Sequence, residues 1–165
     1  KVQFTKPYMQ NEQELITPKK SGITSFAQMK GKLLGAQNGS SGYDAFTTQP
    51  NVLKNIVKNQ DAVLYDSFNE ALIDLKSGRI DGLLMDKVYA GYYLKQRNEI
   101  DDFNMITGDY ESEDFVVGAR KSDDELVKKI NEGIAQLEKT GEFQMISEKW
   151  FGEDVTPVHE TKKSE

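Results

Sequence analysis

The sequence predicts an α/β fold in which a parallel sheet carries helices on both faces. Strand and helix patterns alternate from Lys32 to Thr107, and such alternation is typical of βαβ crossovers. The chain has 165 residues, so it is long enough to bury a core without a disulfide or a structural metal. Cysteine is absent, which excludes disulfide frameworks, thiolate zinc sites and cysteine nucleophiles.

The first half of the chain is divided by prolines, glycines and helix caps. Pro18 and a Lys-Lys-Ser-Gly loop follow the second predicted strand, so we expect the first hinge at Ile16–Lys20. Ser25 and Gln28 have the spacing of a capping box, which predicts a short helix through Lys30. The predicted strands are Val2–Thr5, Glu14–Thr17, Lys32–Gln37 and Ala62–Tyr65, and the predicted helices are Gly42–Thr47 and Val52–Lys58, the second with Val52, Leu53 and Ile56 facing inward.

The second half of the chain has clearer helix signals. Ser67 and Glu70 predict a capping box, and Gly78 ends the helix that follows. The remaining expected elements are strand Gly82–Met85, helix Lys87–Gln96, strands Asn104–Thr107 and Phe115–Ala119, a long helix capped by Ser122 with Glu125 and ended by Gly141, and a short helix whose Phe143, Ile146, Trp150 and Phe151 face a core. The polar tail from Glu153 is expected to be disordered.

Charge limits the classes of partner. The net charge is −6 and the pI is about 5.0, and no basic run exceeds the pairs Lys19-Lys20 and Lys162-Lys163. These features argue against nucleic acid and anionic membranes as partners. No run of apolar residues is long enough to span a membrane and no signal peptide is present, so any export signal or lipid anchor is expected upstream of Lys1.

A glycine and serine turn is the first candidate binding feature. The apolar strand pattern at Leu33–Ala36 continues through Gln37 into the turn Gly39-Ser40-Ser41-Gly42, which opens a predicted helix. Unpaired N–H groups and the positive end of the helix dipole stabilise an anion at such a place, and the hydroxyls add donors. The alternative is that the serine is a plain N-cap.

Asp86 is the second candidate, because it follows the buried strand Gly82–Met85. Ligands of open parallel sheets bind outside the carboxyl ends of the strands, so Asp86 is expected to face the same crevice as Ser40 and Ser41. An anion site beside a carboxylate suits a zwitterionic α-amino acid. The alternative is that Asp86 only caps the helix that follows it.

Other chemistry finds little support in the sequence. The turn lacks the spacing of a nucleotide P-loop, no G-x-G-x-x-G follows a strand, and zinc ligands are lacking, so no cofactor or metal is expected. The single histidine, His159, lies in the tail, away from any serine that it would have to activate. The roles of two groups of residues remain open in the sequence. The acidic cluster Glu111-Glu113-Asp114 is either a solvated hinge loop or an ion-pair latch between lobes. The tyrosines Tyr89, Tyr92 and Tyr93 either pack the helix or reach the crevice.

Five strings carry a resemblance when they are taken in order: FTKPY at Phe4–Tyr8, MKGKLLGAQNGSSGYDAF, ALIDLKSGRIDGLLMD, EDFVVGARKSDDEL, and EKWFG at Glu148–Gly152. Together they resemble the extracytoplasmic solute-binding proteins of polar amino-acid ABC transporters, bacterial solute-binding protein family 3. The resemblance covers nearly the whole chain, and its specificity lies in the ordered set.

The resemblance implies a periplasmic-binding-protein-like clamshell with lobe two complete and lobe one partial. Members of this family have a substantial lobe-one segment before the FTKPY string, so the carboxylate-binding arginine and the aromatic residues of that segment have no counterpart here. In such a chain Trp150 and Phe151 are expected to expose apolar surface and to favour self-association. Amino-acid binding is expected to be poor, because the turn and Asp86 would face solvent and the opposing arginine is missing. The expected division is 1–18 for part of lobe one and the first hinge, 19–110 for lobe two, 111–152 for the second hinge strand and the C-terminal helices of lobe one, and 153–165 for the tail.

The resemblance implies a non-catalytic protein that closes on a polar amino acid of the glutamine, cystine or arginine class and delivers it to an ABC permease. Its expected location is extracytoplasmic, either periplasmic or as a cell-surface lipoprotein whose only membrane contact is an upstream lipid anchor. The alternatives are a dehydratase of prephenate-like acids that uses Asp86 as acid or base, and a ligand-sensing domain. EDFVVGARKSDDEL resembles cystine or broad polar amino-acid members most. The expected ligand-binding residues are Tyr8, Gln37, Gly39, Ser40, Ser41 and Asp86.

Overall fold

The computed structural model describes residues 1–157 and divides them into two compact units. Unit 1 combines Lys1–Asn11 with the described residues from Glu113 onward, and unit 2 is Glu12–Ser112. Unit 2 begins at Glu12, earlier than the expected boundary at residue 18, and the segment assigned to the first hinge lies within it: Ile16–Pro18 end a strand of its sheet, and Lys19 and Lys20 begin a 3-10 turn. His159 and the Lys162-Lys163 pair lie outside the described residues.

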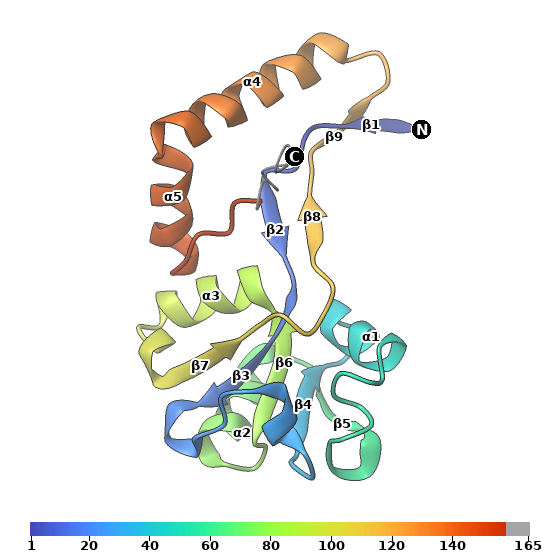
Figure 1. Ribbon diagram of the computed structural model, residues 1–165, viewed down its shortest axis with the longest axis vertical. Helices are drawn as coiled ribbons and strands as arrows, with labels where there is room; N and C mark the ends of the chain where they lie inside the picture. Colours follow the sequence, from blue (N-terminus) through green and yellow to red (C-terminus); the bar gives the residue numbers. More distant parts are fainter. Residues whose placement is uncertain (158–165) are drawn as a thin grey trace, which may run out of the picture. The chain divides into compact units, whose positions relative to one another are not determined.

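Unit 2 is built on a five-stranded mixed sheet (Figure 1). β4 pairs in parallel with β5 and β6, whereas β3 is antiparallel to both β6 and β7. The prediction of a fully parallel sheet is therefore wrong for β3. No crossover helix precedes β3, so the rule that makes βαβ strands parallel does not apply to it. The strands are β3 Gln13–Pro18, β4 Leu34–Gln37, β5 Ala62–Tyr65, β6 Gly82–Asp86 and β7 Phe103–Ile106, in the order β5-β4-β6-β3-β7.

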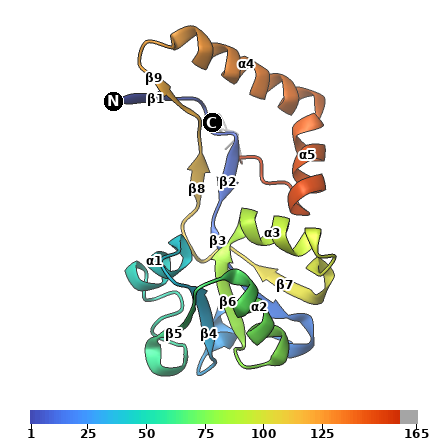
Figure 2. The ribbon, with the colours of Figure 1, turned by 180° about the vertical axis from the view of Figure 1, so that it is seen from behind.

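Helices cover both faces of this sheet, as the sequence predicts. Leu15 on β3 belongs to a core cluster with Phe46 of α1, and the next residue, Ile16, belongs to the cluster on the other face with Leu72 of α2 and Leu94 of α3. Adjacent strand residues point to opposite faces, so one strand supplies both cores. Figure 2 shows α2 lying over the strands. The helices are α1 Ser41–Thr48, α2 Phe68–Ser77 and α3 Lys87–Gln96.

The predicted helix Val52–Lys58 is wrong, because the segment forms successive turns and a 3-10 turn with Asn59 at φ +63°. β-branched residues and asparagines are poor helix formers, and they outweigh the apolar spacing here. The inward residue Leu53 is nevertheless fully buried. The 3-10 turns are η1 Lys19–Ser21, η2 Phe26–Met29, η3 Lys58–Gln60 and η4 Ile100–Asp102.

Of the three caps predicted from a serine followed three residues later by glutamine or glutamate, only one is confirmed. Ser67 and Glu70 form a reciprocal capping box at α2, and Gly78 ends that helix in the left-handed conformation at φ +77°. The capping box predicted at Ser25 is wrong, because Gln28 Oε1 instead accepts the backbone N–H of Thr24 at 2.7 Å and the segment is a single 3-10 turn. The cap predicted at residue 122 is also wrong, since the N-cap of α4 is residue 123.

Replacing Ser67 by Ala is expected to lower the free energy of unfolding by about 1 kcal/mol, because the Ser67 hydroxyl no longer accepts the backbone N–H of Glu70. Ser25→Ala is the matched control, since the Ser25 hydroxyl donates to Gln28 Oε1 and caps no backbone group. Its effect is expected to stay within about 0.5 kcal/mol. Urea unfolding followed by circular dichroism compares the two variants, and equal losses would contradict the assignment.

Unit 1 contains two short antiparallel ladders and two helices. β1 pairs with β9 and β2 pairs with β8, so the single strand predicted at Phe115–Ala119 is divided into two. The division comes at Val117, which exchanges hydrogen bonds with Thr5. Gly141 ends α4 as predicted. The elements are β1 Val2–Phe4, β2 Met9–Asn11, β8 Glu113–Phe115, β9 Gly118–Arg120, α4 Asp124–Thr140 and α5 Glu142–Phe151.

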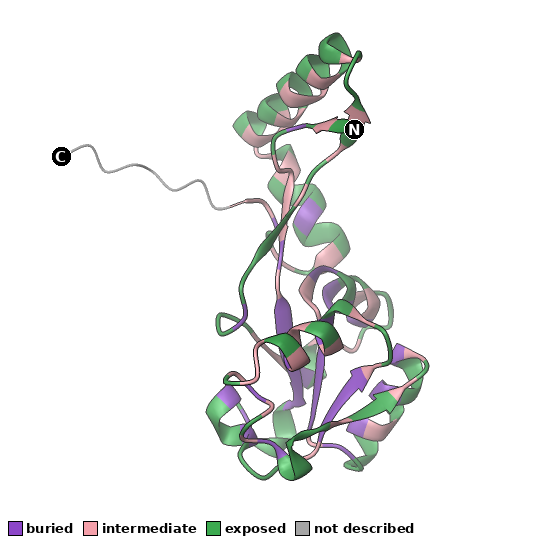
Figure 3. Ribbon diagram, turned by 90° about the vertical axis from the view of Figure 1, so that its right-hand side faces the viewer, coloured by how far each residue is buried: buried purple, intermediate pink, exposed green. Residues whose placement is uncertain are grey.

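No apolar residue of α4 or α5 is buried, and several are exposed. Leu126 on α4 is 51% exposed, and Ile146 and Trp150 on α5 are 49% and 43% exposed. Figure 3 shows α4 without a buried residue, in contrast to the buried strands of unit 2. The prediction that Ile146 and Trp150 face a core is therefore wrong for this chain, whereas the expected exposure of apolar surface at Trp150 is confirmed.

The beginning of the tail is ordered by one apolar residue. Val155 is 2% exposed, its N–H donates to Ser147 Oγ at 2.9 Å, and its carbonyl accepts from the backbone N–H of Gln10 at 2.8 Å. The prediction of disorder from Glu153 is therefore wrong for the described residues 153–157, because burial of Val155 fixes the backbone there.

Candidate functional site

The turn between β4 and α1 uses its first serine as a helix cap. Ser40 Oγ accepts the backbone N–H of Tyr43 at 3.2 Å and donates to the carbonyl of Gln37 at 2.7 Å. The N-cap alternative is therefore confirmed for Ser40. Gly39 stands at φ +68°, the left-handed region that glycine adopts most easily, and so permits the turn. Ser40 therefore shapes the turn, and its hydroxyl proton is already bound within it.

The second serine of the turn is placed differently. Ser41 is exposed, and its Oγ accepts a hydrogen bond from Gln13 Nε2 at 3.1 Å. The first bond of the helix runs from the N–H of Asp44 to the carbonyl of Ser40. The N–H groups of Ser41 and Gly42 precede that bond, so they have no partner within the helix. This terminus therefore presents two backbone donors and one hydroxyl.

Asp86 ends β6 and is the N-cap of α3. Its Oδ1 accepts the backbone N–H of Tyr89 at 2.9 Å, which confirms the capping alternative for this atom. The N–H of Lys87 donates to the carbonyl of Glu12 at 3.0 Å. The first donors of α3 are thus bound within the protein, in contrast to those of α1. A carboxylate has about four lone-pair positions, and the bond to Tyr89 uses one of them.

The sheet brings these residues to one edge. β4 and β6 are neighbouring parallel strands, so the starts of α1 and α3 lie at the same carboxyl edge, the upper edge of unit 2 in Figure 1. Gln13 pairs in register with Asp86 and is hydrogen-bonded to Ser41, so it links the two parts of the site. Gln37 lies at this edge too, but its Nε2 donates to the carbonyl of Asp66 at 3.3 Å.

Two other groups from the sequence are also placed. Tyr8 belongs to unit 1, where its N–H donates to the carbonyl of Phe115 at 3.0 Å, and its role in binding stays a prediction. Tyr93 and Tyr89 both pack edge to face on Phe68, at 4.7 and 5.9 Å between ring centroids, although Tyr89 is 47% exposed. The packing interpretation therefore describes these two tyrosines.

Sequence reasoning missed Gln13, which is only 5% exposed. The available signal was strand alternation: counting back from Leu15 places Gln13 on the face of the sheet that α1 covers. A polar residue at such an inward position is informative, because buried polar groups are normally hydrogen-bonded.

Tyr65, the last residue of β5, joins a separate polar cluster. Its hydroxyl donates to Asp74 Oδ2 at 2.9 Å, and Arg79 Nε donates to Asp74 Oδ1 at 2.7 Å. Burial, followed by the bond to Asp74, raises the pKa of Tyr65 to about 12, so the hydroxyl stays protonated and keeps donating at neutral pH. This cluster holds β5 to α2.

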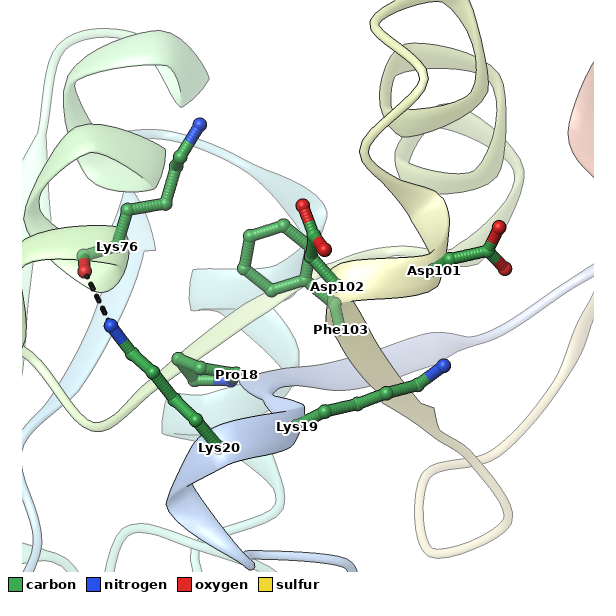
Figure 4. Close-up of a pocket in the computed structure, with 7 residues that line it drawn as sticks. All are labelled: Pro18, Lys19, Lys20, Lys76, Asp101, Asp102 and Phe103. Atoms are coloured by element: carbon green, nitrogen blue, oxygen red, sulfur yellow. Dashed lines mark hydrogen bonds between the residues drawn. The ribbon is translucent and has the colours of Figure 1, made fainter.

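A cavity of about 390 Å³ lies at the opposite edge of the sheet, where β3 ends and β7 begins (Figure 4). Lys20 Nζ donates to the carbonyl of Lys76 at 3.3 Å, and Lys76 Nζ is paired with Glu99 at 2.8 Å. Because its charged groups have both signs and two of its cations are bound within the protein, the cavity shows no preference for a ligand charge. Its lining is Pro18, Lys19, Lys20, Lys76, Asp101, Asp102 and Phe103.

No helix within residues 1–157 is both long enough and apolar enough to cross a membrane.

The family model for bacterial extracellular solute-binding proteins, family 3, matches residues 1–153.

Solved structures and curated proteins similar to this chain are also solute-binding proteins of ABC transporters. A polar amino acid ABC uptake transporter substrate binding protein from Streptococcus thermophilus has a TM-score of 0.87 and 60% identity over 94% of this chain and 59% of its own. A substrate binding protein from Streptococcus pneumoniae, solved with bound histidine, has a TM-score of 0.71 and 58% identity over 94% of this chain and 63% of its own. ABC transporter arginine-binding protein 1 of Escherichia coli (strain K12) is 32% identical over 91% of this chain, which spans 59% of that relative.

Proposed function

Because the chain belongs to family 3 of the bacterial extracellular solute-binding proteins, we propose that it is part of a protein that binds a polar amino acid and delivers it to an ABC transporter permease. Unit 2 is lobe two in this proposal, and unit 1 belongs to lobe one. The proposed location is outside the cytoplasmic membrane, and a lipid anchor stays a prediction.

One observation carries the proposal: two backbone donors of α1 and the carboxylate of Asp86 lie at the same edge of the sheet. The amino-terminal end of a helix attracts an anion through both its N–H groups and its dipole. The carboxylate oxygens of Asp86 accept hydrogen bonds from an ammonium group. A zwitterionic α-amino acid offers both charges on neighbouring carbon atoms, so it matches this edge.

The two serines have different roles in this proposal. Ser40 holds the turn, because its hydroxyl is bound to Gln37 and Tyr43. Ser41 contributes its N–H and its hydroxyl to the ligand carboxylate, together with the N–H of Gly42. Asp86 holds the ammonium while its Oδ1 caps α3.

Histidine and arginine are the first ligands to test, because the Streptococcus pneumoniae protein was solved with histidine and the Escherichia coli relative is an arginine-binding protein. Cystine and glutamine follow from the sequence resemblance. The dehydratase alternative is not favoured for two reasons. Asp86, the acid or base that it requires, caps α3. The family to which the chain belongs consists of solute-binding proteins.

Calorimetry of the full-length protein that contains this chain tests the proposal. Histidine, arginine, cystine and glutamine are titrated in turn, and the recovered ligand is then weighed by mass spectrometry. We expect saturable binding of at least one amino acid, which is recovered with its mass unchanged. Absence of binding to all four would overturn the proposal, and recovery of a dehydrated product would favour the enzyme.

The chain as it stands is expected to self-associate through the apolar surface of α4 and α5. Light scattering should give a mean mass above the monomer, and Leu126→Lys together with Ile146→Lys should lower it, because charge opposes burial of these exposed positions. Ile73→Lys is the matched control, since Ile73 on α2 is 50% exposed but lies in unit 2. A monomer at all concentrations would contradict the expectation.

A further inference from the structure

Gln13 places a carboxamide against the first turn of α1 in a way that costs stability. Its Nε2 donates to Ser41 Oγ at 3.1 Å, but its Oε1 is buried without a hydrogen-bond partner among residues 1–157. A buried acceptor left without a partner lowers stability, because the hydrogen bonds that it made to water are not replaced. An apolar side chain of similar volume would therefore be the more stable choice at this position, and the presence of glutamine needs another reason.

The carboxamide packs closely on the proposed anion site. A Cβ atom at Gly42 would lie 2.9 Å from Gln13 Oε1 and 3.5 Å from the carbonyl of Leu84, so only glycine leaves the carboxamide its place. Gly42 also supplies one of the two N–H groups that precede the first helical bond. The fit between Gln13 and this turn is therefore specific.

We propose that Gln13 is a positioning residue that fixes the Ser41 hydroxyl as a hydrogen-bond donor to the ligand carboxylate, an inference that rests on the proposed function. A hydroxyl has one proton and two lone pairs. When Gln13 Nε2 donates to one lone pair of Ser41 Oγ, the proton is directed away from the carboxamide. This proton is therefore available to a hydrogen-bond acceptor on the exposed side of the turn.

The neighbouring serine shows the contrast. Ser40 Oγ donates its proton to the carbonyl of Gln37 at 2.7 Å, so Ser40 has no proton to offer a ligand. Ser41 is the exposed serine of the pair, and Gln13 occupies its acceptor side. The carboxamide thus pre-orders the one hydroxyl of this turn that is able to reach a ligand, and pre-ordering lowers the entropy lost on binding.

Gln13→Met separates positioning from simple packing. Methionine keeps an unbranched side chain and removes both polar atoms. We expect the melting temperature to stay unchanged or to rise, because the buried acceptor is gone, and the affinity to fall roughly threefold to tenfold. A merely structural glutamine would show the opposite pattern, a lower melting temperature with the affinity retained, and that result would overturn the proposal.

A double-mutant cycle with Ser41→Ala ties the effect to the hydroxyl. Binding of histidine and arginine to the full-length protein is measured for wild type, both single variants and the double variant. In the Ser41→Ala background, Gln13→Met should change the affinity less than about twofold, because the group that it orients is absent. Equal losses in both backgrounds would overturn the proposal.

Gln13→Glu tests the direction of the hydrogen bond. A carboxylate at position 13 accepts the Ser41 proton and places a negative charge beside the ligand carboxylate. The loss of affinity should therefore exceed that of Gln13→Met, and wild-type affinity would overturn the proposal. If wild type binds no amino acid, the proposed function fails and this inference falls with it. If wild type binds but the cycle shows no coupling, only the role of Gln13 fails.

Discussion

Replacing Asp86 by Asn in the full-length protein is expected to weaken amino-acid binding by about 1.5–3 kcal/mol, the range for hydrogen bonds to charged groups. The loss corresponds to a roughly 10- to 150-fold higher dissociation constant. Asp86 stands at the carboxyl edge of β6, opposite Gln13 and beside the donors of α1. Removing its charge leaves the ligand ammonium with a neutral amide, which is a weaker acceptor.

The substitution is informative because it preserves the cap of α3. Asp86 Oδ1 accepts the N–H of Tyr89, and asparagine is as good an N-cap as aspartate. The melting temperature of Asp86→Asn should therefore match that of wild type, whereas Asp86→Ala should lose both stability and affinity. Calorimetry gives the affinities. An unchanged affinity for Asp86→Asn would move the ammonium site elsewhere.

Replacing Ser41 by Pro is expected to have the second large effect on binding. Ser41 is the first residue of α1, a position where proline fits because its missing N–H has no partner within the helix. Ser40 already has the extended backbone that proline requires before it, with φ −81° and ψ 158°. The helix should therefore persist while both donors of Ser41 to the ligand carboxylate, the N–H and the hydroxyl, disappear.

Ser41→Ala is the control, because it removes only the hydroxyl. We expect Ser41→Ala to cost about 0.5–1.5 kcal/mol of binding free energy and Ser41→Pro about 1.5–3 kcal/mol, since an N–H that donates to a charged group contributes more. A ligand in which the α-carboxylate is replaced by a carboxamide serves as a check for steric clash. Because this ligand lacks the anionic carboxylate, Ser41→Pro should weaken its binding less than it weakens binding of the amino acid itself. Equal losses for Ser41→Ala and Ser41→Pro would show that the hydroxyl alone matters.

The local signals in the sequence predicted most of unit 2. The bounds of α3 agree at Lys87–Gln96, and α1 and α2 differ from the prediction by a residue or two at most. These helices carry caps, glycine stops and one apolar face, all of which act over a few residues. The candidate residues Ser40, Ser41 and Asp86 lie at one edge because each stands at or just after the end of a strand of a parallel pair.

The failures concern features that depend on distant partners. The direction of β3 depends on its neighbours β6 and β7, which come much later in the sequence. Gln13 meets Ser41 only in the folded unit, and the exposure of Trp150 reflects what surrounds α5 rather than the spacing within it. Spacing also overstated the helix at Val52–Lys58, where asparagines and β-branched residues favour turns.

The antiparallel strand β3 also has a consequence for the order of folding. The stretch from β4 to β6 consists of local βα units, whereas the pairs of β3 with β6 and β7 join segments that are far apart in the chain. Contacts of high sequence separation carry a larger loop-closure entropy and tend to limit the folding rate. Gln13 reaches Ser41 only when β3 inserts between β6 and β7, so we expect the proposed anion site to be completed in the same step as the contacts that limit the folding rate.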